Sequence, residues 1–154
     1  MLKTMYADGQ LEVLEVLAAH GVDLSARDAR GMSAVHLAGL GGHPHVLAFV
    51  GGLSARDGKG RTCGHYAAEK GHVSVLRFLA EHDEDLGVAD GQRASMAHLS
   101  AYFGHAEALA LVLKNAPKLR SARDGGGKTP QALARQRGDA AVLRVLEKAE
   151  RDEL

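Results

Sequence analysis

The chain has 154 residues, a length that fits one compact domain or one short repeat array. Its 19 basic and 19 acidic side chains give a formal net charge of zero, which excludes a general electrostatic attraction to nucleic acid or to anionic membranes. The single cysteine, Cys63, excludes an internal disulfide, and no apolar run reaches the roughly 18 residues of a membrane-spanning helix.

The first segment, residues 1–27, predicts a truncated helical unit. Residues 1–8 supply only a short first helix, which Gly9 ends, and apolar residues then follow at helical spacing at Leu11, Leu14 and Leu17. Two interpretations stay open: the segment is a minimal N-terminal cap, or the chain starts inside a longer array.

Four further units follow, at about residues 28–56, 57–89, 90–123 and 124–149, with a frayed tail at 150–154. Their main evidence is a set of fixed offsets. In the first three of these units a histidine (His36, His65, His98) follows an aspartate by eight residues and precedes a glycine by six. Self-similarity of this kind is typical of repeat architectures.

Each unit predicts a turn, two antiparallel helices and a connecting hairpin. Ser33, Thr62, Ser95 and Thr129 are suited to N-cap the first helix, and the glycine after the histidine is suited to end it. The unit at residues 28–56 is four residues shorter than the unit at residues 57–89, and its second helix runs into Gly51-Gly52. A shortened helix or hairpin is therefore expected there.

Four segments carry a family resemblance: Ser33-Ala34-Val35-His36, Thr62-Cys63-Gly64-His65, Ser95-Met96-Ala97-His98 and Thr129-Pro130-Gln131-Ala132. Together they resemble the ankyrin repeat, whose signature is Thr-Pro-Leu-His-x-Ala. The resemblance covers residues 1–149. It implies an all-α solenoid of helix-turn-helix units with short β-hairpin-like loops, forming one domain over residues 1–154 with four to five repeats, the N-terminal one truncated. The structural residues it implies are Ser33, His36, Gly42, Thr62, His65, Gly71, Ser95, His98, Gly104, Thr129, Pro130 and Gly138.

The resemblance also implies a function, since ankyrin repeats bind partner proteins on a concave face made of hairpin tips and inner helices. The expected contact residues, carried over by position, are Arg30, Met32, Leu40, Lys59, Arg61, Glu69, Lys70, Gln92, Tyr102, Phe103, Lys128 and Arg137. Six of these are basic and one is acidic, which predicts a partner with an acidic surface. Tyr102 and Phe103 are expected to anchor it, with Leu40 and Met32 beside them. The chain itself is expected to be a monomer.

Two alternatives come from other functional classes. The same basic face predicts binding of nucleic acid or another acidic ligand, although no nucleic-acid motif is present. Cys63 with His65 is a conceivable pair for an enzyme. We expect no catalytic residues, no cofactor and no metal, because six of the nine histidines occupy two recurring framework positions.

Two features of the chain termini bear on where in the cell the protein is expected. Residues 1–10 contain no apolar run of signal-peptide length, which predicts a cytoplasmic protein. The C-terminal Arg151-Asp152-Glu153-Leu154 resembles an endoplasmic-reticulum retention tetrapeptide. We do not expect it to act as one without a signal peptide.

Overall fold

The computed structural model describes residues 16, 19–21 and 23–151, and within them the chain forms four helix pairs. The first helices of the pairs, which we call the inner helices, are α3 (Ala34–Gly41), α5 (Cys63–Lys70), α7 (Met96–Phe103) and α9 (Pro130–Arg137). The second helices, which we call the outer helices, are α4 (Pro44–Val50), α6 (Val73–Glu81), α8 (Ala106–Asn115) and α10 (Ala140–Arg151). A short 3₁₀ helix, η1 (Pro117–Arg120), follows α8.

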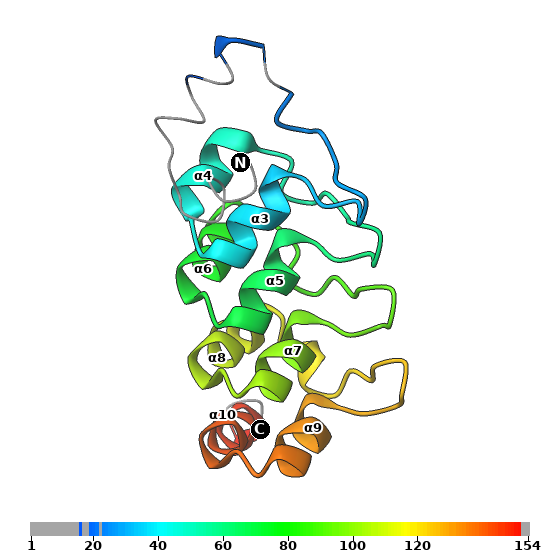
Figure 1. Cartoon of the computed structure of the whole chain (residues 1–154). Coiled ribbons are helices and arrows are strands. Elements are labelled where there is room, and N and C mark those ends of the chain that lie inside the picture. The colour runs from blue at the N-terminus through cyan, green and yellow to red at the C-terminus, as the bar shows by residue number, and fades with distance from the viewer. Residues whose placement is uncertain (1–15, 17–18, 22, 152–154) are drawn as a thin grey trace.

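The pairs stack into a solenoid with an inner and an outer layer. Each inner helix packs on the inner helix of the next pair and each outer helix on the next outer helix, and the connecting hairpins project together to one side (Figure 1). Within the described residues, β pairing is limited to one isolated bridge between Ala89 and Ser95. The predicted all-α helix-pair architecture is thereby confirmed.

Each inner helix begins at a residue that ends the preceding hairpin in an extended conformation. Ser33, Thr62, Ser95 and Thr129 are these N-cap residues. Thr129 accepts a hydrogen bond from the backbone N–H of Ala132, and Pro130 follows it at the first helical position, where no backbone donor is needed.

The histidines three residues after the first three N-caps stabilise the helix starts, and two of them also bind the next unit. The Nδ1 atoms of His36, His65 and His98 accept the backbone N–H of their own N-cap residue at 3.1–3.2 Å. We therefore assign the proton of each ring to Nε2. The Nε2 of His36 donates to the carbonyl oxygen of Arg61, at 3.1 Å, in the following hairpin. The Nε2 of His98 likewise donates to the carbonyl oxygens of Ala122 and Lys128 in the next unit, both at 3.1 Å.

The inner helices end at glycines in the left-handed conformation, and a second set of histidines depends on these glycines. Gly71 has φ of 74°, and a side chain there would also collide with the ring of His105, at 2.6 Å. His105 Nε2 donates to the carbonyl oxygen of Glu69, at 2.9 Å, just before that glycine. His72 makes the equivalent bond to Leu40 of its preceding unit, at 3.0 Å.

The core consists of small residues between the inner helices and larger ones beneath the outer helices. A Cβ atom at Gly39 of α3 would lie 2.4 Å from the carbonyl oxygen of Cys63 in α5, so these helices are in backbone contact. The fully buried aliphatic side chains of the outer helices include Val46, Leu47, Val75, Leu76, Leu109, Val112, Val142 and Leu146. A single helix pair cannot cover such a face by itself, and stacking therefore supplies most of the stability.

The unit at residues 28–56 is four residues shorter than the next unit, and the difference lies half in its outer helix and half in the segment that follows that helix, residues 51–56 against 82–89. Helix α4 has 7 residues, whereas α6, α8 and α10 have 9, 10 and 12. It ends at Gly51, whose φ of 67° stops the helix. The helices predicted within residues 1–17 lie outside the described residues apart from Val16, and so do the last three residues of the C-terminal tetrapeptide.

Candidate interaction surface

Each hairpin is closed by one aspartate, the residue found eight positions before the histidine in the first three units. Oδ1 of Asp57 accepts hydrogen bonds from the backbone N–H groups of Lys59 and Arg61, at 2.8 and 2.9 Å. Asp28, Asp90 and Asp124 make the same two bonds in their own hairpins. The recurring aspartate is therefore a turn-forming residue.

The hairpin tips are joined to one another by backbone hydrogen bonds. The N–H groups of Gly58, Gly91 and Gly125 donate to the preceding hairpin, at Arg30, Lys59 and Gln92, over 2.7–2.9 Å. A Cβ atom at any of these glycines would lie within 2.8 Å of the accepting oxygen. The sequence signal for this contact is the Asp-Gly pair that recurs at Asp57-Gly58, Asp90-Gly91 and Asp124-Gly125.

The recurring Ser-Ala-Arg-Asp segments also have a structural explanation. Arg56 Nη1 donates to the carbonyl oxygen of Gly60 across its own hairpin, at 2.7 Å, and to that of Ala89 in the next hairpin, at 2.9 Å. Arg27 makes the equivalent bonds to Gly31 and to Arg56. These arginines fix the spacing between adjacent hairpins.

Replacing Arg56 should therefore weaken the contact between two units. We expect Arg56→Ala to lower the free energy of unfolding by about 1 kcal/mol, because two carbonyl groups lose a charged donor at a solvent-exposed position. Urea denaturation followed by circular dichroism measures this change. The matched control is Arg123→Ala, since Arg123 donates within its own hairpin to Gly127. An equal loss of stability in both variants would contradict the role of Arg56 between units.

On the inner-helix face, Arg61 lies between two acidic side chains. Its Nη1 is 2.7 Å from Glu69 and its Nε is 3.2 Å from Asp90 of the next unit. Burial acts to lower the pKa of Arg61, and the bonds to Asp90 and Glu69 raise it above its usual value. Only 17% of the Arg61 side chain is exposed, so this residue contributes little free positive charge to the surface.

Tyr66 connects this ion-pair group to the preceding hairpin. Its hydroxyl donates to Oδ2 of Asp57 at 2.5 Å, and the Cζ of Arg61 lies 5.7 Å from its ring centroid. Burial, together with the bond to Asp57, raises the pKa of Tyr66 to about 12. Burial acts to raise the pKa of Asp57, but hydrogen bonds from Tyr66 and the backbone lower it. Tyr66 is therefore a structural member of this face.

The exposed aromatic group of the face is at the end of α7. Tyr102 is 51% exposed, and its ring meets that of Phe103 edge-on, with centroids 5.0 Å apart. Phe103 is half-buried and packs against the core. Arg137 of α9 donates to the backbone carbonyl oxygen of Tyr102 at 3.0 Å, which links the end of α7 to the next unit.

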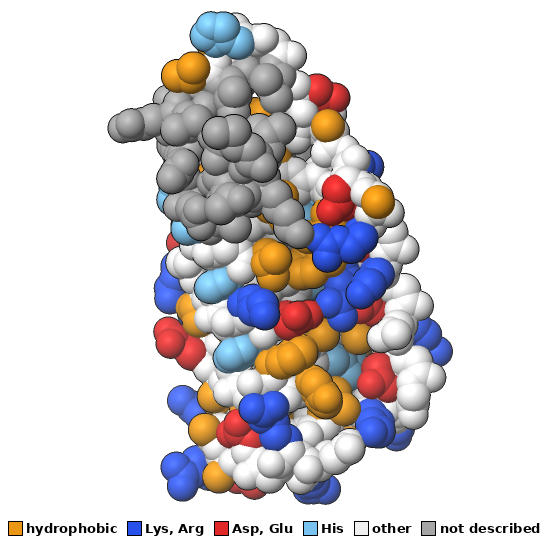
Figure 2. All heavy atoms as spheres, in the orientation of Figure 1, with side chains coloured by type: hydrophobic (Ala, Val, Ile, Leu, Met, Phe, Trp, Pro, Cys, Tyr) orange, Lys and Arg blue, Asp and Glu red, His pale blue; other side chains and the backbone are white. Residues whose placement is uncertain are grey.

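Four cations of the face are exposed and lack an ion-pair partner among the described residues: Lys59, Lys70, Lys128 and Arg137. Lys128 instead donates to the side-chain oxygen of Gln136, at 2.8 Å. Figure 2 shows Lys and Arg side chains gathered with hydrophobic ones over α5 and α7, with few acidic side chains among them. The face therefore combines an apolar centre with free positive charge.

Three of the expected contact residues do not lie on the surface as exposed residues with free charge, as the sequence predicted. Met32 is 4% exposed and belongs to the core, because its hairpin folds back onto α3, so it does not border the aromatic pair. Arg61 and Glu69 neutralise each other. Of the remaining nine, Arg30, Lys59, Lys70, Gln92, Tyr102, Lys128 and Arg137 are exposed, and Leu40 and Phe103 are half-buried.

Cys63 lacks the features of a nucleophile. Its side chain is fully buried, its Sγ donates to the carbonyl oxygen of Leu53, and burial raises the pKa of the thiol to about 12. His65 directs its Nδ1 at the backbone and hydroxyl of Thr62. The pair therefore does not form the activated thiol that the enzyme alternative requires. Over the described part of the chain, no three His, Cys, Asp or Glu residues converge as metal ligands.

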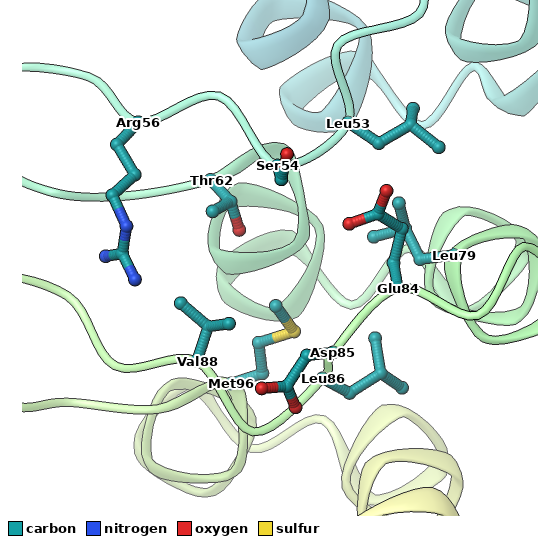
Figure 3. Close-up of a pocket in the computed structure, with 10 residues that line it drawn as sticks. All are labelled: Leu53, Ser54, Arg56, Thr62, Leu79, Glu84, Asp85, Leu86, Val88 and Met96. Carbon is teal, nitrogen blue, oxygen red and sulfur yellow. The ribbon is translucent and has the colours of Figure 1, made fainter.

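A small recess lies where the segments after α4 and α6 approach the start of α7. Its volume is about 150 Å³, below the roughly 300 Å³ at which ligand sites begin. Figure 3 shows the Met96 side chain between Thr62 and Leu86, with Arg56, Glu84 and Asp85 around it. We assign no ligand to this recess.

Comparison with known proteins agrees with this geometry. Residues 2–90, more than half of the chain, match the family described as Ankyrin repeats (3 copies). A search among curated proteins found no match. Across the residues described, none of the helices combines the length and apolar character needed to span a membrane. The helix pairs after residue 90 repeat the same N-caps, terminal glycines and hairpin contacts, and the chain belongs to the ankyrin repeat family.

Proposed function

We propose that this chain is a protein-interaction module that binds an acidic segment of a partner on its hairpin tips and inner helices. Ankyrin repeats are in general protein-interaction modules, which supports the broad assignment. The observation that carries the finer proposal is the free charge: Lys59, Lys70, Lys128 and Arg137 are exposed on the hairpins and inner helices that also carry the exposed ring of Tyr102, while Glu69 and Asp90 are bound to Arg61.

Electrostatic complementarity explains why this arrangement selects a partner. Arg61 offsets one of the two negative charges of Glu69 and Asp90, and Asp90 is buried, so these acids repel an incoming carboxylate less than two free exposed acids would. The exposed lysines attract such a partner from a distance and raise the association rate, and the ring of Tyr102 supplies apolar contact once it has docked.

Charge reversal on this face should reduce partner binding and its salt dependence. We expect Lys59→Glu/Lys70→Glu to weaken capture of the specific partner by about tenfold or more, because two attractive contacts become repulsive. Affinity capture identifies the partner with the native chain, and surface plasmon resonance at two ionic strengths then compares the variants.

The matched control is Arg77→Glu/Arg144→Glu, which reverses two exposed charges on the outer helices α6 and α10. Equal binding by the native chain and the Lys59→Glu/Lys70→Glu variant would refute the proposed surface. Binding of DNA or RNA by the native chain at physiological ionic strength would instead support the nucleic-acid alternative and count against an acidic protein partner.

A further inference from the structure

A second surface lies on the outer helices, away from the hairpin tips. Helices α8 and α10 pack side by side in the outer layer and leave a groove between them (Figure 1). The groove has a volume of about 520 Å³, and its apolar lining consists of Ala110, Leu113, Pro117, Val145 and Ala149. Ala110 and Pro117 of this lining are exposed, Val145 and Ala149 are half-buried, and Leu113 is buried.

The charges that line this groove have one sign. Both of its charged residues are lysines, Lys114 near the end of α8 and Lys148 near the end of α10, and both are exposed. Neither has an ion-pair partner among the residues that the structure describes. Lys114 lies between the lining residues Leu113 and Pro117, and Lys148 lies between Val145 and Ala149, so the positive charge lies beside the apolar lining.

The neighbouring groove provides an internal comparison. Between α6 and α8 the equivalent space is lined by charges of both signs, Arg77 and Lys114 together with Glu81 and Glu107. An apolar partner with acidic residues would meet repulsion there as well as attraction. The combination of an apolar lining with lysines alone is thus a property of the α8–α10 groove and not of every groove in the outer layer.

We propose that the α8–α10 groove docks an amphipathic helix of a partner protein, with Asp or Glu beside the apolar stripe where it faces Lys114 and Lys148. A helix satisfies its own backbone hydrogen bonds, so a groove that offers only side chains can hold it by burying an apolar stripe. The lining runs from Ala110 in α8 to Pro117 in η1, about two helical turns, so a helix of the partner can lie along it. The two lysines then favour acidic side chains beside that stripe.

The test uses the full chain and a displayed library of amphipathic helices of about 18 residues, long enough to form helix readily. Each has a fixed leucine stripe and Glu, Lys or Gln at the positions beside it. We expect selection to enrich Glu beside the stripe, and the selected peptides to lose about tenfold in affinity for Lys114→Glu/Lys148→Glu. Ala110→Gln, which fills the groove at an exposed position and keeps both lysines, should cause a similar loss.

The matched control is Lys59→Glu/Lys70→Glu, whose changes lie on the inner-helix face, and it should bind the selected peptides within about twofold of the native chain. Thermal melts of the variants establish that they are folded. The proposal is overturned if selection favours Lys or Gln, if the control variant loses as much affinity as the groove variants, or if Ala110→Gln binds normally. It is also overturned if Lys114 and Lys148 are instead required for self-association in sedimentation experiments or for binding to vesicles of anionic lipid.

Discussion

Lowering the pH from about 7 to about 4 should remove about 3 kcal/mol from the free energy of unfolding through His65 alone. His65 is fully buried, and burial lowers the pKa of its imidazole from 6.5 to about 4. Burial also lowers the pKa values of His36 and His98, which occupy the equivalent positions. Their contributions add to that of His65.

The direction follows from which state binds more protons. As the pH falls below 6.5, the unfolded chain takes up protons on these histidines, whereas the folded chain holds them neutral. The stabilisation is therefore complete above pH 6.5 and is lost as the pH falls toward about 4, where His65 titrates in the folded chain. Asp57, whose pKa hydrogen bonds lower below 3.8 despite burial, loses its contribution only at more acidic pH.

Urea denaturation at a series of pH values measures this slope. In His65→Gln the dependence of stability on pH between about 6.5 and 4 should become shallower, because one titrating group is gone. The matched control is His82→Gln, which makes the same substitution at an exposed histidine at the end of α6 and so separates the effect of burial from that of the substitution itself. A slope unaffected by His65→Gln would show that this histidine does not couple folding to pH.

Removing the ring of Tyr102 should weaken binding of an inner-face partner by about 2 kcal/mol, or about 30-fold. This ring is the largest exposed hydrophobic group on the proposed surface, and its edge-on contact with Phe103 holds it in place. Loss of the ring removes apolar contact from the centre of the surface, where lysines cannot replace it. Isothermal titration calorimetry of Tyr102→Ala with the captured partner measures the change.

Tyr102→Phe separates the ring from its hydroxyl, and it should retain binding within a few-fold of the native chain. Since Tyr102 is half exposed, the thermal stability of both variants should remain close to that of the native chain. Unchanged affinity in Tyr102→Ala would remove this residue from the interaction surface and leave the lysines as its main determinants.

The repeat itself could be predicted without coordinates because its signals are local. An N-cap such as Ser33, a histidine three residues later and a glycine at the helix end lie within ten residues of one another, and each has a stereochemical reason for its position. Their recurrence at fixed spacing then established helix pairs that must stack. The exposed position of Tyr102 also followed from its place in this frame.

Contacts between units were decided only by the tertiary structure. Arg61 forms an ion pair with Asp90, and Arg56 donates a hydrogen bond to the carbonyl oxygen of Ala89. Both partners lie about 30 residues away in the chain. Met32 was expected at the surface but is buried by its own hairpin. Local sequence determines where a helix begins and ends, whereas the partner of a long side chain depends on which residue the neighbouring unit places beside it. The groove between α8 and α10 has the same origin, because its two lysines belong to different repeats and share a surface only after the units stack.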